Sequence, residues 1–365
     1  MRCSGKLFSL AVAMVGLALA GGAAAQEPPV VAKASAAEKT RLQALIRDAA
    51  QEGALSYWDA VIQPETNDDL SAAFRKEYGL PASFKVNYTL STTVGLVTRV
   101  DQELQANRVT IDIAAIASLP WVFEHVRHND VMEYDSPQYD AYSKIFGLGM
   151  GKKGYFAFNG SYMFIPMWNA ETTKFSGTSW KDVVGAVPAQ RLSVGDVSKS
   201  EAYAATQIGL RKVLGPDYFE AIAKMSPTYL IRSEQIASRL VSGEDLMAFS
   251  GMPTRAFQFN LRGGQLKFLM PKEGVVLLPQ AMFILKAAPH PATARLWIDF
   301  ILSEEGQKIL VSHEALISGR DGFKSPMPDY APAIDSLNVI PIDWPSVSTD
   351  DVKKIREEWS ATFNR

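Results

Sequence analysis

The sequence has 365 residues, 47% hydrophobic and 21% charged, with 37 Lys and Arg against 39 Asp and Glu. This length is more than one compact core usually holds, so we expect two lobes. A net charge of −2 without a basic run makes nucleic acid and anionic membranes poor candidate partners.

The beginning of the chain predicts a signal peptide. Arg2 and Lys6 form a basic start, residues 7–20 are apolar, and small residues precede Ala25, after which we expect cleavage and release into the periplasm. An apolar run of about 14 residues is shorter than the roughly 20 that cross a bilayer, which argues against the alternative of a membrane anchor. The only cysteine, Cys3, would be lost on cleavage, so we expect no disulfide and no thiolate site in the mature chain.

The first ordered element should be a helix that follows a flexible leader. Residues 26–36 are rich in Pro and Ala without a pattern, which predicts the leader. Apolar residues then recur at helical spacing from residue 37, and Gly53 is placed to end that helix.

The middle of the chain alternates short apolar runs with amphipathic segments, which predicts an α/β fold with largely parallel sheets. The expected strands are 55–58, 85–88, 111–117, 191–194, 228–231 and 246–249. The expected helices are 68–78, 93–106, 120–125, 200–214, 234–242 and 291–302.

Two extended, aromatic-rich passages, 155–168 and 265–285, have no helical period and are expected to cross between the lobes. With these crossings, lobe 1 would comprise residues 37–154 and 275–318. Lobe 2 would comprise residues 155–274 and 319–365.

The segment 274–307 carries the most specific pattern. It contains Gly274-Val275-Val276, Phe283-Ile284-Leu285-Lys286, Ala288-Pro289-His290-Pro291 and Ser303-Glu304-Glu305-Gly306-Gln307. This segment resembles the extracellular solute-binding proteins of the ferric-iron, thiamine and phosphonate branch of bacterial ABC importers, and the likeness extends over residues 38–325. Locally, Pro291 suits the first turn of a helix that Ser303 and Gly306 would close.

The resemblance implies a two-lobed periplasmic-binding-protein fold of type II, with a ligand cleft between lobes that are joined by hinge strands and close on binding. It also implies a protein without catalytic residues or cofactors, which captures a small-molecule ligand and delivers it to an ABC permease in the inner membrane. We expect a monomer.

Ligands of α/β lobes bind beyond the carboxyl ends of strands, where helix N-termini present free N–H groups. The polar and aromatic side chains that follow the predicted strands are therefore the candidate ligand-binding residues. They are Trp58, Asp59, Ser91, Thr92, Thr93, Ser118, Trp121, Ser198, Ser200, Tyr203, Ser250, Thr254 and Arg255.

Each candidate also has a structural interpretation. The Ser and Thr residues are good helix N-caps, and Trp58 and Trp121 are large enough to belong to the core. Asp59, if it faces the cleft, favours an amine or a metal. Arg255, together with Lys199, instead favours a phosphate, phosphonate or carboxylate, unless both are solvated surface charges.

The ferric subgroup of the resembled family has two adjacent tyrosines after the strand that here ends near Phe249. This chain has Met252-Pro253-Thr254-Arg255 there, and it contains no adjacent tyrosine pair. Its four histidines are scattered, so we expect no metal site. The sequence favours a small organic ligand with an anionic group, and leaves ferric iron or a polyamine as alternatives.

Two other functional classes remain open. A periplasmic enzyme is disfavoured because the Gly-x-Ser-x-Gly and His-Glu-x-x-His motifs are absent from the sequence. A receptor that reports its ligand to a membrane signalling protein would use the same fold and the same closure, so the sequence does not separate it from a transport protein.

Overall fold

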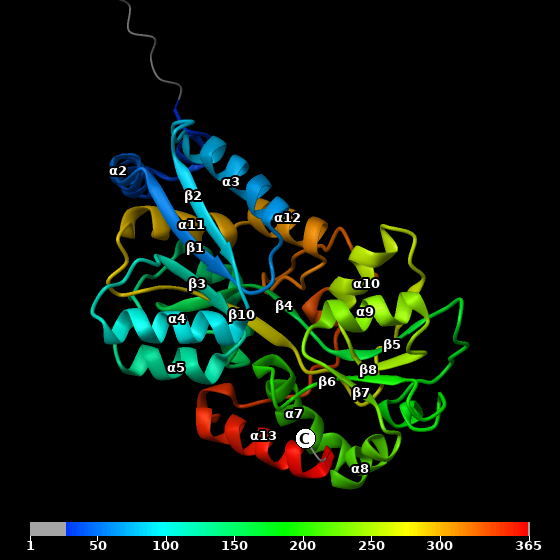
Figure 1. The fold of residues 1–365 in the computed structure, drawn as a ribbon. Coiled ribbons are helices and arrows are strands. Elements are labelled where there is room, and N and C mark those ends of the chain that lie inside the picture. Colours follow the sequence, from blue (N-terminus) through cyan, green and yellow to red (C-terminus); the bar gives the residue numbers. More distant parts are fainter. Residues whose placement is uncertain (1–26, 364–365) are drawn as a thin grey trace, which may run out of the picture.

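The computed structural model describes residues 27–363 (Figure 1). The predicted signal peptide and its cleavage site after Ala25 lie outside these residues. Within them, no helix combines the length and apolar character that a membrane-spanning segment needs.

The first of two five-stranded sheets has the strand order β2-β1-β3-β10-β4. Its strands are β1 (Ala54–Asp59), β2 (Lys85–Leu90), β3 (Ile113–Ile116), β4 (Phe156–Tyr162) and β10 (Leu278–Ile284). β1 pairs in parallel with β2 and β3, whereas β10 runs antiparallel to β3 and β4. The sheet is therefore mixed, with its parallel strands at one edge.

Helices cover both faces of this sheet. They are α2 (Ala36–Glu52), α3 (Pro64–Tyr78), α4 (Thr93–Gln105), α5 (Leu119–Arg127), α11 (Pro291–Ile301) and α12 (Glu304–Glu314). Figure 1 shows α4 and α5 together on one side of the sheet, and the other four helices on the opposite side. In the core beneath α11, the ring of Trp297 lies 5.5 Å from that of Tyr57 and 5.0 Å from that of Phe74. We call this sheet and its helices lobe 1.

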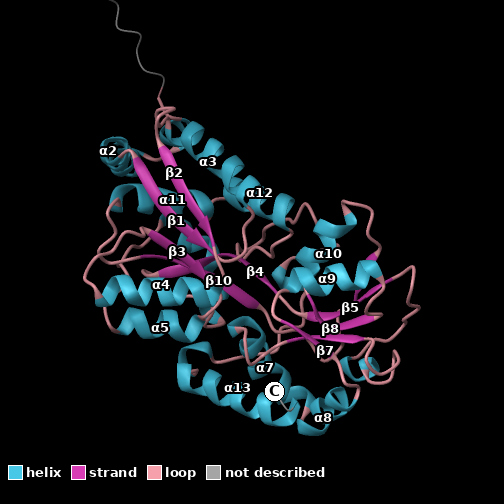
Figure 2. Ribbon diagram, in the orientation of Figure 1, coloured by secondary structure: helices cyan, strands magenta, loops and turns pink. Residues whose placement is uncertain are grey.

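The second sheet has the order β7-β6-β8-β5-β9, and Figure 2 shows it as a separate group of strands. Its strands are β5 (Ile165–Asn169), β6 (Leu192–Gly195), β7 (Thr228–Leu230), β8 (Met247–Gly251) and β9 (Leu266–Phe268). The helices packed with it are α7 (Glu201–Leu214), α8 (Pro216–Lys224), α9 (Ser233–Ser242) and α10 (Pro253–Asn260). We call this unit lobe 2; like the sheet of lobe 1, its sheet has two parallel and two antiparallel strand pairs, so that one strand, here β5, runs against the other four.

The chain crosses between the lobes within both predicted passages. It leaves the first sheet after Tyr162 and enters the second at Ile165, then returns between Phe268 and Leu278. We expected lobe 2 to begin at position 155. The chain instead stays in the sheet of lobe 1 through Tyr162, because β4 still pairs with β10.

The C-terminal part of the described chain contacts both lobes. A 3-10 turn at Trp344–Ser346 packs against α5 of lobe 1, and α13 (Thr349–Phe363) packs against α7 and α8 of lobe 2. Arg356 of α13 pairs with Glu201 at the start of α7, 2.5 Å between Nη2 and Oε2. This segment, which we expected to belong to lobe 2, thus bridges the two lobes.

Two local features differ from the sequence analysis. Within the expected leader, α1 (Pro29–Lys33) forms a short helix, because Val31 is fully buried against α2 and α3. Ser303 serves two helices: its hydroxyl donates to the Phe300 carbonyl in the last turn of α11 at 2.6 Å, as a residue that closes this helix would, and it also accepts from the Gly306 N–H at 3.2 Å, which caps the start of α12. By contrast, the prediction that Gly53 ends α2 is confirmed, with φ +70° and its N–H bonded to the Ala49 carbonyl.

Candidate functional site

A cleft of about 470 Å³ lies between the lobes. Its lining comes from both lobes and from the crossing between β4 and β5. The lining residues are Ala60, Gln63, Leu90, Ser91, Thr92, Thr93, Val94, Tyr162, Phe164, Lys199, Ser200, Glu201, Ala202, Tyr203, Ile231, Arg232, Ser233, Glu234 and Arg255. This volume is typical of small-molecule sites in proteins.

The lobe 1 wall is formed by the end of β2 and the first turn of α4. Thr92 is the N-cap of α4, and its hydroxyl accepts from the Gly95 N–H at 3.1 Å. A Cβ at position 95 would lie 2.7 Å from the Ser91 hydroxyl oxygen, so glycine leaves room for that side chain. Ser91, Thr92 and Thr93 thus place three hydroxyls beside the positive end of a helix dipole.

The lobe 2 wall presents the N-termini of α7 and α9 and one side chain of α10. Lys199 and Ser200 precede α7, where the Ser200 hydroxyl accepts from the Tyr203 N–H at 3.4 Å. Arg232 and Ser233 stand at the start of α9, and Arg255 lies in the first turn of α10. Helix N-termini and cations together favour an anion on this wall.

Arg255 is half-buried and held by neutral partners. Its Nε donates to the Ser233 hydroxyl at 3.3 Å, and its Nη1 donates to the Gln258 Oε1 at 2.6 Å. Within residues 27–363, no carboxylate forms an ion pair with it. Burial lowers the pKa of Arg255 because a guanidinium loses hydration there. The carboxylates of Glu314 and Glu234 oppose this shift without contacting the guanidinium, so an anionic ligand would supply a direct counter-charge.

Arg255 is connected to lobe 1 through Gln258 and Glu314. The Gln258 Nε2 donates to the Glu314 Oε2 at 3.1 Å, and Glu314 itself is fully buried. The other carboxylate oxygen accepts from the Gln63 N–H at 2.7 Å and from the Thr66 hydroxyl at 2.6 Å. Burial raises the pKa of Glu314, although these hydrogen bonds oppose the shift. This Arg255–Gln258–Glu314 chain links a cleft residue of one lobe to the β1–α3 loop of the other.

Aromatic side chains from the crossing segment and α7 also line the cleft. The ring of Phe164 lies 5.6 Å from that of Tyr162 and 4.3 Å from that of Tyr203. A Cβ at position 195 would lie 2.4 Å from the Tyr203 ring, so Gly195 makes room for it. Within the described residues, the buried Tyr203 hydroxyl has no hydrogen-bond partner, and burial raises its pKa.

Six of the candidate residues meet in the cleft: Ser91, Thr92, Thr93, Ser200, Tyr203 and Arg255, and Lys199 lies there too. Ser118 and Trp121 instead line an adjoining pocket of about 310 Å³ between α4, α5, α7 and α13. There the Ser118 hydroxyl donates to the Glu201 Oε1 at 3.2 Å, and the Trp121 Nε1 donates to Asp101 at 3.2 Å.

Asp59 does not face the cleft. It is fully buried and accepts hydrogen bonds from the Tyr57 hydroxyl, the Val61 and Ile62 N–H groups, and the amides of Asn159 and Gln280. Burial raises its pKa against the effect of these donors. Asp59 would have favoured an amine or a metal as ligand only if it faced the cleft, so it gives no support to either.

The remaining candidates, Trp58, Ser198, Ser250 and Thr254, do not line this cleft. Trp58 packs beneath the guanidinium of Arg99 at 5.9 Å, and Ser198 donates to the Asp196 carboxylate. Ser250 is buried within β8, and the buried Thr254 hydroxyl lies 3.5 Å from the Ala315 carbonyl oxygen.

Sequence reasoning overlooked several cleft residues. Arg232 and Ser233 directly follow a strand that was correctly located, so the strand-end rule could have found them. Tyr162 and Phe164 gave no such signal, because only the path of the crossing segment brings them into the cleft. The described residues hold no group of three His, Cys, Asp or Glu side chains placed to bind a metal.

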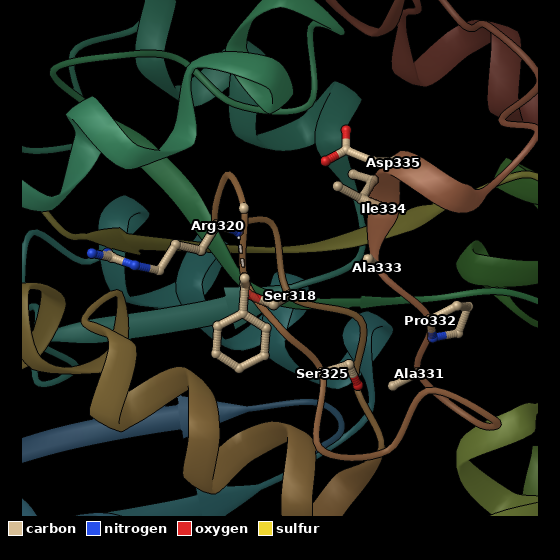
Figure 3. Close-up of a pocket in the computed structure, with 10 residues that line it drawn as sticks. Ser318, Arg320, Ser325, Ala331, Pro332, Ala333, Ile334 and Asp335 are labelled. Atoms are coloured by element: carbon tan, nitrogen blue, oxygen red, sulfur yellow. Dashed lines mark hydrogen bonds between the residues drawn. The ribbon is translucent and has the colours of Figure 1, made fainter.

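Another hollow, near the C-terminal end of α12, is far smaller. Ser318, Arg320 and residues 331–335 are among its lining, and its volume of about 10 Å³ suits a single water molecule (Figure 3). The guanidinium of Arg320 points away from it and donates to the Gln138 side chain and the Leu302 carbonyl. A solute therefore has room in the interlobe cleft and not here.

The two mixed sheets, the paired crossings and the cleft define a two-lobed binding protein of the type II periplasmic class. A model of the bacterial extracellular solute-binding protein family matches residues 109–335, more than half of the chain. The chain belongs to this family. No curated protein was found to match the sequence.

Solved structures share the fold. The substrate-binding protein of an ABC transporter from Agrobacterium tumefaciens aligns with a TM-score of 0.73 at 14% identity, over 85% of this chain and 94% of its own. AfuA from Actinobacillus pleuropneumoniae, with fructose-6-phosphate bound, gives 0.71 at 17% identity, over 85% and 98%. Iron-bound HitA from Pseudomonas aeruginosa gives 0.68 at 15% identity, over 84% and 99%. At these identities the likeness establishes the fold alone, and AfuA and HitA hold different ligands, fructose-6-phosphate and iron.

Proposed function

We propose that this chain is the periplasmic substrate-binding component of an ABC importer, and that it binds a small organic solute with an anionic group. The group would be a phosphonate, a phosphate ester or a carboxylate. The protein would act as a monomer, would make or break no bond, and would deliver its ligand to a permease in the inner membrane.

The arrangement around Arg255 carries the proposal. Its guanidinium lines the cleft without an ion pair among the described residues, beside the first turns of α7 and α9. Arginine binds an oxyanion through two parallel hydrogen bonds, and such charge-assisted bonds are stronger than neutral ones. An anionic solute would therefore complete a site whose positive charge is already in place.

The alternatives within the same fold fit this wall less well. A polyamine would meet three cations, Lys199, Arg232 and Arg255, which repel it. The two carboxylates of the lining are already paired, Glu201 with Arg356 and Glu234 with Arg232. Ferric iron prefers several phenolate and carboxylate ligands, but the cleft lining offers only two tyrosines, Tyr162 and Tyr203, and the described residues hold no group of three His, Cys, Asp or Glu side chains that could bind a metal.

The first experiment is native mass spectrometry of the protein purified without denaturation, followed by a thermal-shift screen. The screen would compare phosphonates, sugar phosphates, carboxylates, polyamines and ferric iron. We expect one anionic class to co-purify or to raise the melting temperature, since a ligand that binds only the folded state stabilises it. Stabilisation by a polyamine or ferric iron with no response to any anion would contradict the proposal.

A deletion strain tests the role in the cell. Loss of solute uptake is expected for a transport protein, and the bound ligand should be released unchanged. Loss of a signalling response with uptake intact would instead identify a receptor.

A further inference from the structure

Exposed aliphatic side chains gather at the cleft. Among the described residues, eight large hydrophobic side chains are exposed, and three of them line this one cavity. They are Leu90, Val94 and Ile231, which are 38%, 45% and 54% exposed. Apolar side chains that gather in a concave site are a common mark of ligand contact.

These side chains come from matching places in the two lobes. Leu90 ends β2, an edge strand of the first sheet, and Val94 follows in the first turn of α4. Ile231 follows β7, an edge strand of the second sheet, just before α9. Each lobe therefore contributes aliphatic surface next to a polar helix N-terminus.

The fold does not require apolar residues at these positions. α4 buries Leu96 and Val100 against lobe 1, whereas Val94 lies off that face. Ile231, which precedes α9, is more than half exposed, whereas Ile236 within α9 is fully buried. A polar residue at either exposed position would avoid the cost of contact with water.

We infer that the solute carries an apolar body, an aryl or branched alkyl group, beside its anionic group. This inference rests on the proposed function and narrows it. The anionic group would bind at Arg255 and the helix N-termini, and the apolar body would contact Leu90, Val94 and Ile231 above the aromatic rings of Phe164 and Tyr203. A hydroxyl-rich sugar phosphate would place polar groups against these side chains, where they lose hydrogen bonds to water.

Two matched pairs of probes test the inference by isothermal titration calorimetry: methylphosphonate with phenylphosphonate, and acetate with phenylacetate. Within a pair the charged group is retained and the apolar body changes. We expect the phenyl member of at least one pair to bind tenfold or more tightly than its parent, which is about 1.4 kcal/mol.

The variants Val94→Ser and Ile231→Ser, separately and together, locate the effect. We expect the double variant to lose about tenfold in affinity for the phenyl probe and to keep its affinity for the parent anion. Val213→Ser is the matched control, because Val213 is 37% exposed on α7 and does not line the cleft. It should leave both affinities unchanged.

The outcomes separate the two proposals. Equal affinity within both pairs, or a double variant that retains the preference for the phenyl probe, overturns the apolar-body inference while the anion site stands. If no probe of either pair binds, and the screen finds no other anion, both fall. If the double variant instead alters only the lobe separation of the unliganded protein, measured between paired spin labels, these side chains serve lobe closure and the inference is wrong.

Discussion

The two walls of the cleft differ in how they meet a solute. The lobe 1 wall offers hydroxyls at the start of α4, and among its described lining residues none is charged. The lobe 2 wall holds Lys199, Arg232 and Arg255 together with Glu201 and Glu234, and Glu201 is already paired with Arg356. Under the proposed function, we therefore expect lobe 2 to recognise the charge of the ligand and lobe 1 to add neutral hydrogen bonds when the lobes close.

The largest effect should come from the lobe 2 wall. Arg255→Gln removes the half-buried cation, and we expect tenfold to hundredfold weaker binding of the anionic ligand, since a hydrogen bond to a charged group contributes about 1.5–3 kcal/mol. Calorimetric titration measures the change. Arg262→Gln is the control, because Arg262 is exposed and lies outside the cleft. Equal affinities of the two variants would contradict the assignment of charge recognition to Arg255.

A smaller effect on ligand affinity is expected from the Arg255–Gln258–Glu314 chain, which connects the two lobes. In Glu314→Gln, an amide would face the Gln258 amide that now donates to Glu314. Gln258 would turn over and lose its bond from Arg255, so we expect roughly fivefold to tenfold weaker binding, about 1–1.4 kcal/mol. Unchanged affinity would show that Arg255 is positioned without Glu314.

The pH dependence of stability checks the charge of Glu314 independently of any ligand. Burial raises its pKa above the ordinary value of 4.5, so the folded chain holds this proton more tightly than the unfolded chain. The resulting stability is fully present below that value and is lost as pH rises through the folded pKa. The unfolding free energy of the wild type, relative to Glu314→Gln, should therefore fall as pH rises in urea titrations between about pH 4 and 7. A flat difference would mean that the pKa is ordinary.

The lobe 1 wall should give weaker effects of two kinds. Ser91→Ala removes a neutral donor, and we expect threefold to tenfold weaker binding at unchanged stability, from about 0.5–1.5 kcal/mol. Thr92→Ala should also lower the unfolding free energy by about 1 kcal/mol, because Thr92 caps α4. Titration and urea unfolding of both variants separate recognition from capping. A loss of stability in Ser91→Ala would show that Ser91 belongs to the scaffold.

The smallest effect concerns salt. Mobile ions screen exposed charges such as Lys199 and Arg232 over about 10 Å at 0.1 M, so affinity should fall a few-fold between low and moderate ionic strength. Affinity that does not change with salt would indicate that only the half-buried Arg255 acts on the ligand.

Local sequence patterns predicted the scaffold well, because apolar runs and helical spacing are properties of short segments. They located the strands and helices that position Ser91, Thr92, Thr93 and Ser200. For Arg255 they located only the preceding strand, because the helix α10 that carries this residue was not predicted. The patterns did not predict which strand-end side chains are buried, because that depends on residues far away in the sequence. Asp59 follows a strand as a ligand residue would, but its donors include Asn159 and Gln280, which only the fold brings near.

The sequence also could not predict the connection from Arg255 to Glu314, because it joins residues that are far apart in the chain. Glu314 is the last residue of α12, a helix that the sequence analysis did not predict, since Ser303 and Gly306 were interpreted only as the end of the helix before it. No spacing in the sequence relates Glu314 to Gln258 in the other lobe.

The C-terminal segment would give an optical signal for the lobe closure that we expect on ligand binding. Trp344 is almost completely buried where its turn packs against α5, while α13, a few residues later, rests on lobe 2. A rotation of one lobe against the other would strain the short segment between Trp344 and α13, and would alter the surroundings of the Trp344 indole. The fluorescence of Trp344, obtained by subtracting the emission of Trp344→Phe, would then report the motion without an attached dye.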